Sequence, residues 1–501
     1  MSLAFNENKN IYYYSLSLFI LFLSCLYNDM FSASTNVSSL IVDGGRVLSG
    51  EGLYSDIPEI NPPASVLFYI PSVWIENIAG IKAEHVTVFL TIFILFVSIE
   101  LSARVLYYNN LIENRGLWVF LSIFSFGSIA LDSFAEREHI ALIMILPILS
   151  IVASRLEGKS VSSSKKILFG IMAGVAVCIK PHFAAAIFIP QAYVAFKRRS
   201  LASIFCLENV TAFICFIFYW VIVIKYYGIY FENILPQALD VYVAYRMPLV
   251  SLLAVLLPLL IVFAASMALV WEVSPKWLRS IDSVLLLASL GFLVAYISQG
   301  KIWSYHYYPA AALMLLVSLD LMATKLNGVK WGESSLKRRL MASFIVMTSF
   351  VFVEASLFKP IPQDSLELVE LIKNNYESPK VISISGDVGV SNPLIRRVNG
   401  RSASNGGCCI ITENVHNILR STPYISEEKK NSLNKWENKD REALIHDFVK
   451  WRPDVLLIDT RTWFVDWVNW IKQDEGLTTL VCQYEVMGKT KSVALLFRRN
   501  K

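Results

Sequence analysis

The chain has 501 residues, of which 55% are hydrophobic, and a mean hydropathy of +0.51. Soluble globular proteins rarely reach this hydropathy, so the composition excludes an ordinary soluble enzyme and predicts an integral membrane protein. The formal net charge of +5 is spread along the chain, and we therefore expect no nucleic-acid partner.

Apolar runs recur from Ile11 to Phe358, and most approach the ~20 residues that a helix needs to cross the hydrocarbon core. The first run could be a cleaved signal peptide, but it is long for one, which favours an uncleaved span. The sequence thus predicts a polytopic α-helical membrane protein. Its eleven expected transmembrane helices lie near residues 11–33, 85–106, 117–131, 138–153, 167–180, 183–196, 201–224, 249–272, 282–298, 307–324 and 340–358.

The segment 167–196 is ambiguous because Lys180-Pro181-His182 interrupts it. It forms either two short spans or one kinked helix. With two spans and the N-terminus inside, the inner loops carry more than twice as many Lys and Arg residues as the outer segments, in agreement with the positive-inside rule. This orientation predicts an integral membrane protein with a cytoplasmic N-terminus and with residues 359–501 outside.

The C-terminal part changes character at residues 359–362, so we expect a membrane domain over 1–358 and a soluble domain over 359–501. The soluble part alternates apolar segments of helical and strand character, which predicts a small α/β domain. The expected helices cover 366–374 and 441–450, and the expected strands cover 381–384, 455–458, 480–486 and 493–498. Its cysteines, Cys408, Cys409 and Cys482, form either one disulfide or none.

The first outer loop, residues 42–63, is rich in acidic residues: Asp43, Glu51, Asp56 and Glu59. Gly and Pro residues predict tight turns there, and the loop closes with Pro62-Pro63. A carboxylate in a partly dry site can take a proton from a hydroxyl group, so Asp43 is a candidate general base. The alternative is an acidic loop that is simply solvated.

The second outer turn places five ionisable residues next to the membrane: Asp132, Glu136, Arg137, Glu138 and His139. Charges at membrane depth are costly and are therefore candidates for function, although Glu136 and Arg137 could simply pair with each other.

Cations beside aromatic residues lie at the same side of the predicted bundle: Lys180, His182, Lys301, Tyr305 and His306. Cations bind phosphate by charge, and aromatic faces pack on sugar rings. The alternative is lysines that extend to the membrane surface within an aromatic belt.

These patterns resemble the GT-C superfamily of membrane glycosyltransferases, which includes bacterial aminoarabinose transferases and protein O-mannosyltransferases. Asp43 stands where the family has its first-loop catalytic aspartate. Residues 48–56 with Asn61-Pro62-Pro63 resemble the family's Gly-x-x-Tyr-x-Asp…Pro-Pro signature. Ile179-Lys180-Pro181 resembles its lysine at an outer break, and residues 299–309 resemble its Lys-x-x-Tyr-x-x-x-Pro segment.

The chain also departs from the family in two places. Asp43-Gly44-Gly45 stands where many relatives have an Asp-Glu pair, and Glu136-Arg137-Glu138-His139 matches no known substrate subclass. The resemblance therefore leaves the sugar and the acceptor open.

The resemblance implies transfer of a hexose or pentose from a polyprenyl-phosphate carrier to a glycan, lipid or protein acceptor at the outer face. Asp43 would be the general base, and Asp132 or Glu136 would orient the acceptor or hold a cation. No metal is required, and a divalent cation stays an open alternative. The residues expected to bind substrate are Asp56, Glu59, Arg137, His139, Lys180, His182, Lys301, Tyr305 and His306.

Two rival functions remain at this stage. The first is a transporter or flippase of a lipid-linked or anionic substrate. Such proteins often contain internal repeats, and none is visible in this sequence. The second is a polysaccharide polymerase or ligase.

Overall fold

The computed structural model describes residues 2–27, 33–57, 59–271, 278–328, 363–404, 409–422, 424–462 and 465–499. The described residues do not include Cys408 or the transmembrane helix expected at 340–358. The other two cysteines of the C-terminal part, Cys409 and Cys482, are free thiols. The chain forms two compact units, and the first comprises residues 1–31, 87–221 and 247–359. The second comprises residues 32–86, 222–246 and 360–501, so the C-terminal residues share a unit with two earlier segments.

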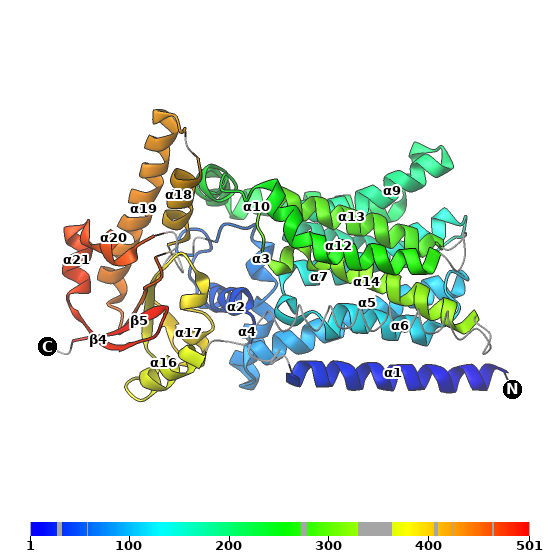
Figure 1. The fold of residues 1–501 in the computed structure, drawn as a ribbon, viewed down its shortest axis with the longest axis horizontal. Helices are drawn as coiled ribbons and strands as arrows, with labels where there is room; N and C mark the ends of the chain where they lie inside the picture. The colour runs from blue at the N-terminus through cyan, green and yellow to red at the C-terminus, as the bar shows by residue number, and fades with distance from the viewer. Residues whose placement is uncertain are drawn as a thin grey trace. The chain divides into compact units, whose positions relative to one another are not determined.

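The first unit is a bundle of long helices that run side by side (Figure 1). Its helices in the described part of the chain are α1 (Ser2–Tyr27), α5 (Ala83–Tyr108), α6 (Arg115–Ile123), α7 (Arg137–Leu156), α8 (Ser163–Ile179), α9 (Ala184–Arg198), α10 (Leu207–Tyr226), α12 (Leu249–Trp271), α13 (Ser280–Gln299) and α14 (Ser304–Gly328). Every predicted span up to residue 324 overlaps one of them, but α6 covers only the first part of the span predicted at 117–131 and is continued by the π-helical turn η2 (Phe124–Ser128). Of these, α5, α7, α10, α12, α13 and α14 are long and apolar enough to cross a membrane, which confirms a polytopic protein.

Helix α7 lies at the centre of this bundle. Its residues from Arg137 to Ser154 are all buried, and it packs against α8, α9, α13 and α14. A helix that is apolar on all sides is expected in the middle of a membrane domain. The polar residues at the start of α7 are consequently enclosed by other helices.

The chain reverses direction at Lys180-Pro181-His182. The Nζ of Lys180 donates to the Oε1 of Glu138 at the start of α7 over 2.5 Å, while Gln191 of α9 accepts from Arg155 near the end of α7 over 2.9 Å. Helices α8 and α9 therefore follow α7 in opposite directions. The interpretation as two short helices is confirmed, and the kinked helix is excluded.

The second unit contains a five-stranded mixed sheet with the order β2-β1-β3-β5-β4. Its strands are β1 (Lys380–Ile384), β2 (Arg401–Ser402), β3 (Val455–Asp459), β4 (Tyr484–Lys489) and β5 (Val493–Arg498). Strand β1 pairs in parallel with β2 and β3, while β5 is antiparallel to β3 and β4. The strand predicted over 480–486 begins later, because Glu475–Val481 forms helix α21, from which Leu480 and Val481 pack against the core.

Helices cover both faces of the sheet, which confirms the predicted α/β domain. On one face, α19 (Glu427–Trp451), α20 (Trp467–Lys472) and α21 pack on alternate strand residues such as Ile382 and Ile384. On the other face, α16 (Gln363–Lys373) and α17 (Leu394–Arg397) pack on Val381 and its neighbours. Alternate side chains of a strand point to opposite faces, so a sheet buried on both sides needs apolar residues throughout.

Other helical elements of the second unit come from earlier parts of the chain. They are α2 (Thr35–Leu48), α3 (Ala64–Leu67), α4 (Ile70–Ala79), and the π-helical turns η6 (Tyr230–Ile234) and η7 (Ala238–Tyr242) with α11 (Leu235–Gln237) between them. The C-terminal segment itself adds helix α18 (Ile410–Ser421).

The start of the first outer loop is a helix, contrary to the expected turns. The Oγ of Ser34 accepts a hydrogen bond from the amide of Val37 over 3.2 Å and so caps α2 at its N-terminus. Gly44 costs the helix about 1 kcal/mol relative to Ala. A Cβ at this position would lie 3.6 Å from Ile70 of α4, which is an ordinary contact, so the packing does not require glycine here. Gly44 lies within helix α2 and makes no turn.

Candidate functional site

In the first unit, a tight turn leads into α7. Leu131 and Ala135 adopt left-handed backbone conformations, with φ of 49° and 61°, which cost free energy in residues other than glycine. Asp132 is exposed, whereas the next ionisable residues, Glu136 to His139, are all buried. Burying several ionisable groups in one turn is costly unless they are paired or bound.

Glu138 connects three segments that the sequence singles out separately. Its Oε1 accepts from the Nζ of Lys180 over 2.5 Å and lies 3.5 Å from the Nε2 of His306. Lys180 also donates to the Oε1 of Gln299 over 3.1 Å. Glu138 and Gln299 were not among the predicted site residues. Both were visible as polar residues near membrane level, but their pairing depends on contacts between distant helices.

The cluster around Glu138, called here the cation cluster, carries excess positive charge. His306 lies close enough to three cationic side chains to interact with their charges; these are Lys180, Arg137 and Lys301. His182 is also close to it. The two carboxylates beside Lys180 are Glu136 and Glu138, so within the cluster three cationic side chains face two anionic ones. Such a cluster can attract a phosphate group, since hydrogen bonds between ionised groups are about twice as strong as neutral ones.

Two imidazole nitrogens of this cluster are buried without a hydrogen-bond partner among the described residues. They are the Nδ1 of His306 and the Nε2 of His182. Buried polar atoms in proteins are normally paired, so each of these nitrogens is available to a ligand or water.

His139 has a structural explanation. Its Nδ1 accepts from the amide of Ala135 over 3.0 Å, and its Nε2 lies 2.5 Å from the carbonyl oxygen of Phe126. Because a carbonyl can only accept, the proton must be on Nε2. Both ring nitrogens thus hold the turn before α7 in place.

Aromatic rings adjoin the cation cluster at the start of α14. Trp303 and Tyr305 stack with ring centres 5.8 Å apart, and Tyr305 contacts His306 edge-on at 4.5 Å. The predicted combination of cations with aromatic rings is therefore present in this unit.

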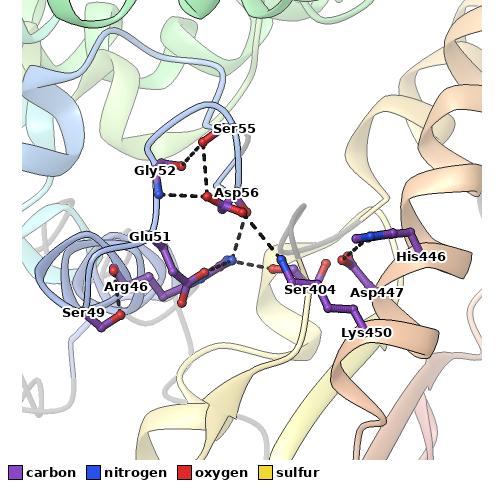
Figure 2. A network of polar contacts seen from close by, with 10 residues as sticks. All are labelled: Arg46, Ser49, Glu51, Gly52, Ser55, Asp56, Ser404, His446, Asp447 and Lys450. Carbon is purple, nitrogen blue, oxygen red and sulfur yellow. Dashed lines mark hydrogen bonds and ion pairs between the residues drawn. The ribbon is translucent and has the colours of Figure 1, made fainter.

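In the second unit, the four acidic residues of the first outer loop have different environments. Glu51 accepts from Arg46 over 2.6 and 2.9 Å. Asp56 accepts from the amide of Gly52 over 3.0 Å and lies 3.6 Å from the Nζ of Lys450 (Figure 2).

The other two acidic residues of this loop contrast with each other. Glu59 accepts from the backbone and the side chain of Asn61. Asp43, partly buried on α2, makes no side-chain hydrogen bond to another described residue. Among the four carboxylates of this loop, Asp43 is thus the one whose oxygens are open to a ligand.

The pKa of Asp43 is shifted towards neutral pH. Burial is the main cause that raises the pKa of this carboxyl to about 7; Glu59 and Glu51 also raise it, and Arg46 opposes the shift. In contrast, the amide of Gly52 lowers the pKa of Asp56. A general base works best when its pKa is close to the working pH, so Asp43 is suited to that role.

Arg46, one turn after Asp43 on α2, holds the loop in place. Besides Glu51, it donates to the carbonyl oxygens of Ser404 and Asp56 over 2.7 and 2.9 Å (Figure 2). The side chain is buried, and these contacts occupy all three guanidinium nitrogens. This arrangement attaches the first outer loop to the segment that follows β2.

The Gly-Leu-Tyr-Ser-Asp segment of the loop forms a tight turn. Tyr54 has a left-handed backbone with φ of 79°, donates its hydroxyl to the carbonyl of Asn61 over 2.6 Å and packs on Tyr230. A Cβ at Gly52 would lie 2.1 Å from the Oγ of Ser55, so no larger residue fits there unless this side chain moves. The segment that resembles the family's Gly-x-x-Tyr-x-Asp signature thus forms a tight turn in this structure.

Among the residues that the structure describes, no three His, Cys, Asp or Glu side chains are placed to hold a metal ion. The question of a divalent cation stays open.

No known family profile and no curated protein matches this sequence. Solved structures match it along almost the whole chain. One is ArnT from Cupriavidus metallidurans bound to undecaprenyl phosphate, with 10% identity, a TM-score of 0.54 and coverage of 97% of each chain. The apo state of the same protein gives 11% identity, a TM-score of 0.52 and the same coverage. The predicted resemblance to the GT-C fold is confirmed, and at this identity the likeness shows the fold alone.

Proposed function

We propose that this protein is a glycosyltransferase that moves a sugar from a polyprenyl-phosphate-linked donor to an acceptor hydroxyl. The observation that carries the proposal is the buried cation cluster in a chain with the fold of ArnT, which has been solved with undecaprenyl phosphate. The sugar would be a hexose or a pentose, and the acceptor a glycan, a lipid or a protein.

Asp43 is the proposed general base. Its carboxylate takes the proton of the acceptor hydroxyl while that oxygen attacks the anomeric carbon of the sugar. The bond from this carbon to the phosphate oxygen breaks, and the phosphate leaves with the electron pair. The open oxygens of Asp43 and its pKa of about 7 support this role, because the group gains and loses a proton near neutral pH.

The cation cluster is proposed to stabilise the departing polyprenyl phosphate. Negative charge develops on the leaving oxygen, and fixed cations in a partly dry site stabilise it strongly. Arg137, Lys180 and Lys301 supply the cationic side chains. His182 and His306 have buried nitrogens that no described residue occupies and could bond to the phosphate oxygens.

Replacement of a single cation tests the donor site. In Lys301→Ala and Arg137→Ala, turnover of a polyprenyl-phosphate sugar should fall by an amount equivalent to about 1.5–3 kcal/mol, the usual worth of one hydrogen bond to a charged group. Lys301→Arg should recover part of the loss, because charge matters more than shape for a single phosphate contact. The measurement is turnover of purified protein against donor concentration. Unchanged kinetics in both alanine variants would remove these residues from the donor site.

The proposed orientation places the first outer loop and residues 359–501 outside the cytoplasm, in a bacterial inner membrane with a cytoplasmic N-terminus. A reporter that is active only in the cytoplasm, fused after Lys501, should be silent, whereas the same reporter fused after Arg198 should be active. An active fusion after Lys501 would overturn this orientation.

The C-terminal α/β domain is proposed to bind or position the acceptor, since the candidate base and the cation cluster lie on other segments of the chain. Sugar transfer by the domain alone would contradict this division of roles.

A further inference from the structure

A basic pocket lies at the turn between α9 and α10 in the first unit. Its volume is about 670 Å³, and its lining includes Phe196, Lys197, Arg199, Leu201 and Ile204. This lining contains two cations and no acidic residue. The pocket lies towards the end of α7 that carries Arg155, because Arg155 bonds to Gln191 of α9, whereas the cation cluster is at the beginning of α7.

The backbone at the end of α9 separates the three consecutive cations of this turn. Arg199 adopts a left-handed conformation with φ of 48°, and the amides of Arg199 and Ser200 donate back to Phe196 and Ala195. Lys197 and Arg199 consequently line the pocket. Arg198 does not line it, and its Nη2 lies 3.3 Å from where a Cβ on Gly158 would be.

Two large apolar residues of the lining, Phe196 and Leu201, are exposed, and so is Phe205, which follows the lining residue Ile204. Phe196 is 77% exposed, Leu201 74% and Phe205 77%. Helix α10, which is long and apolar enough to cross a membrane, begins two residues after Phe205. Cations beside exposed apolar residues at the end of such a helix are suited to the boundary between lipid head groups and acyl chains.

We propose that this pocket binds the head group of an anionic phospholipid. The phosphate would lie between Lys197 and Arg199, and the acyl chains would pack on Phe196, Leu201 and Phe205. Basic pockets between transmembrane helices are known sites for anionic lipid head groups. The exposed apolar residues favour a lipid over a soluble phosphate, which would leave them in water. The site is independent of the proposed sugar transfer.

The test measures lipid binding to the purified full-length protein by native mass spectrometry, with phosphatidylglycerol and phosphatidylcholine as probes. The parent protein should retain phosphatidylglycerol in preference to phosphatidylcholine. Each cation near an anionic lipid is worth about a fivefold change in affinity, so Lys197→Gln/Arg199→Gln should weaken retention by about 25-fold. Arg198→Gln, with one charge less on the adjacent residue, should bind as the parent does.

Three outcomes would overturn the proposal. The first is equal retention of the two lipids, and the second is a loss in Arg198→Gln as large as that in Lys197→Gln or Arg199→Gln alone. The third is displacement of phosphatidylglycerol by equimolar glycerol 3-phosphate, which would show that the pocket recognises a soluble phosphate. A thermal unfolding curve of each variant confirms that it is folded before the lipid measurement.

Discussion

Asp43→Asn should lower sugar transfer by about 10²–10⁴-fold, the usual contribution of a general base, while the protein remains folded and still binds its donor. A sugar hydroxyl is a poor nucleophile at neutral pH, and an amide cannot take its proton. The substitution keeps the size of the side chain. Transfer is measured with purified protein and a radiolabelled polyprenyl-phosphate sugar, and donor binding is measured separately.

The other acidic residues of the loop are the matched controls. Glu51 is paired with Arg46, Asp56 accepts from Gly52, and Glu59 accepts from Asn61. Glu51→Gln, Asp56→Asn and Glu59→Gln should each reduce transfer much less than Asp43→Asn. Normal turnover in Asp43→Asn, or abolished turnover in Glu59→Gln alone, would show that the base is a different carboxylate.

The pH profile gives a second view of the same residue. The pKa of Asp43 is raised to about 7, so the carboxyl is largely protonated and inactive as a base below that value. The rate of transfer should therefore rise as pH increases through about 7 and then level off. In Asp43→Asn this rise should disappear from the residual activity.

Glu138→Ala should destabilise the first unit by about 3–5 kcal/mol, because removing one partner of a buried ion pair leaves the other charge uncompensated. Glu138 is fully buried and pairs with Lys180, whose side chain is only 7% exposed. Thermal unfolding in detergent should show a clearly lower Tm. The double variant Glu138→Leu/Lys180→Met should recover much of the loss, since apolar residues of similar size can replace a buried pair.

A surface ion pair in the same unit is the control for this measurement. Arg104 pairs with Glu100 one helical turn away, and its side chain is 53% exposed. Arg104→Ala should cost only about 0.3–0.5 kcal/mol. If the Glu138→Ala and Arg104→Ala variants unfolded at the same temperature, the Lys180–Glu138 pair would not hold the bundle together.

The sequence predicted the helical bundle well because a membrane-spanning helix must be apolar over about 20 residues, and that property is local. The reversal at Lys180-Pro181 was predicted from charge bias. Pro181 supports it, since it has no N–H for a continuing helix. The strands over 381–384, 455–458 and 493–498 were equally clear, because a strand buried on both faces is a short apolar run.

Other features depend on contacts between distant residues and could not be predicted. The sequence gives no sign that Glu138 meets Lys180, which is 42 positions away, or that residues 32–86 and 222–246 share a unit with the C-terminal domain. The helix around Asp43 was also missed, because Gly44-Gly45 is typical of a turn, whereas both glycines lie inside α2. Leu480 and Val481 illustrate that a short apolar run fits a helix end as well as a strand.

The central claim, a donor carried on polyprenyl phosphate, is tested most directly by determining the structure of the full-length protein with undecaprenyl phosphate. The account predicts density for the phosphate within hydrogen-bond distance of Arg137, Lys180 or Lys301. A phosphate bound in the first unit away from all three residues would contradict the assignment of the cation cluster as the donor site.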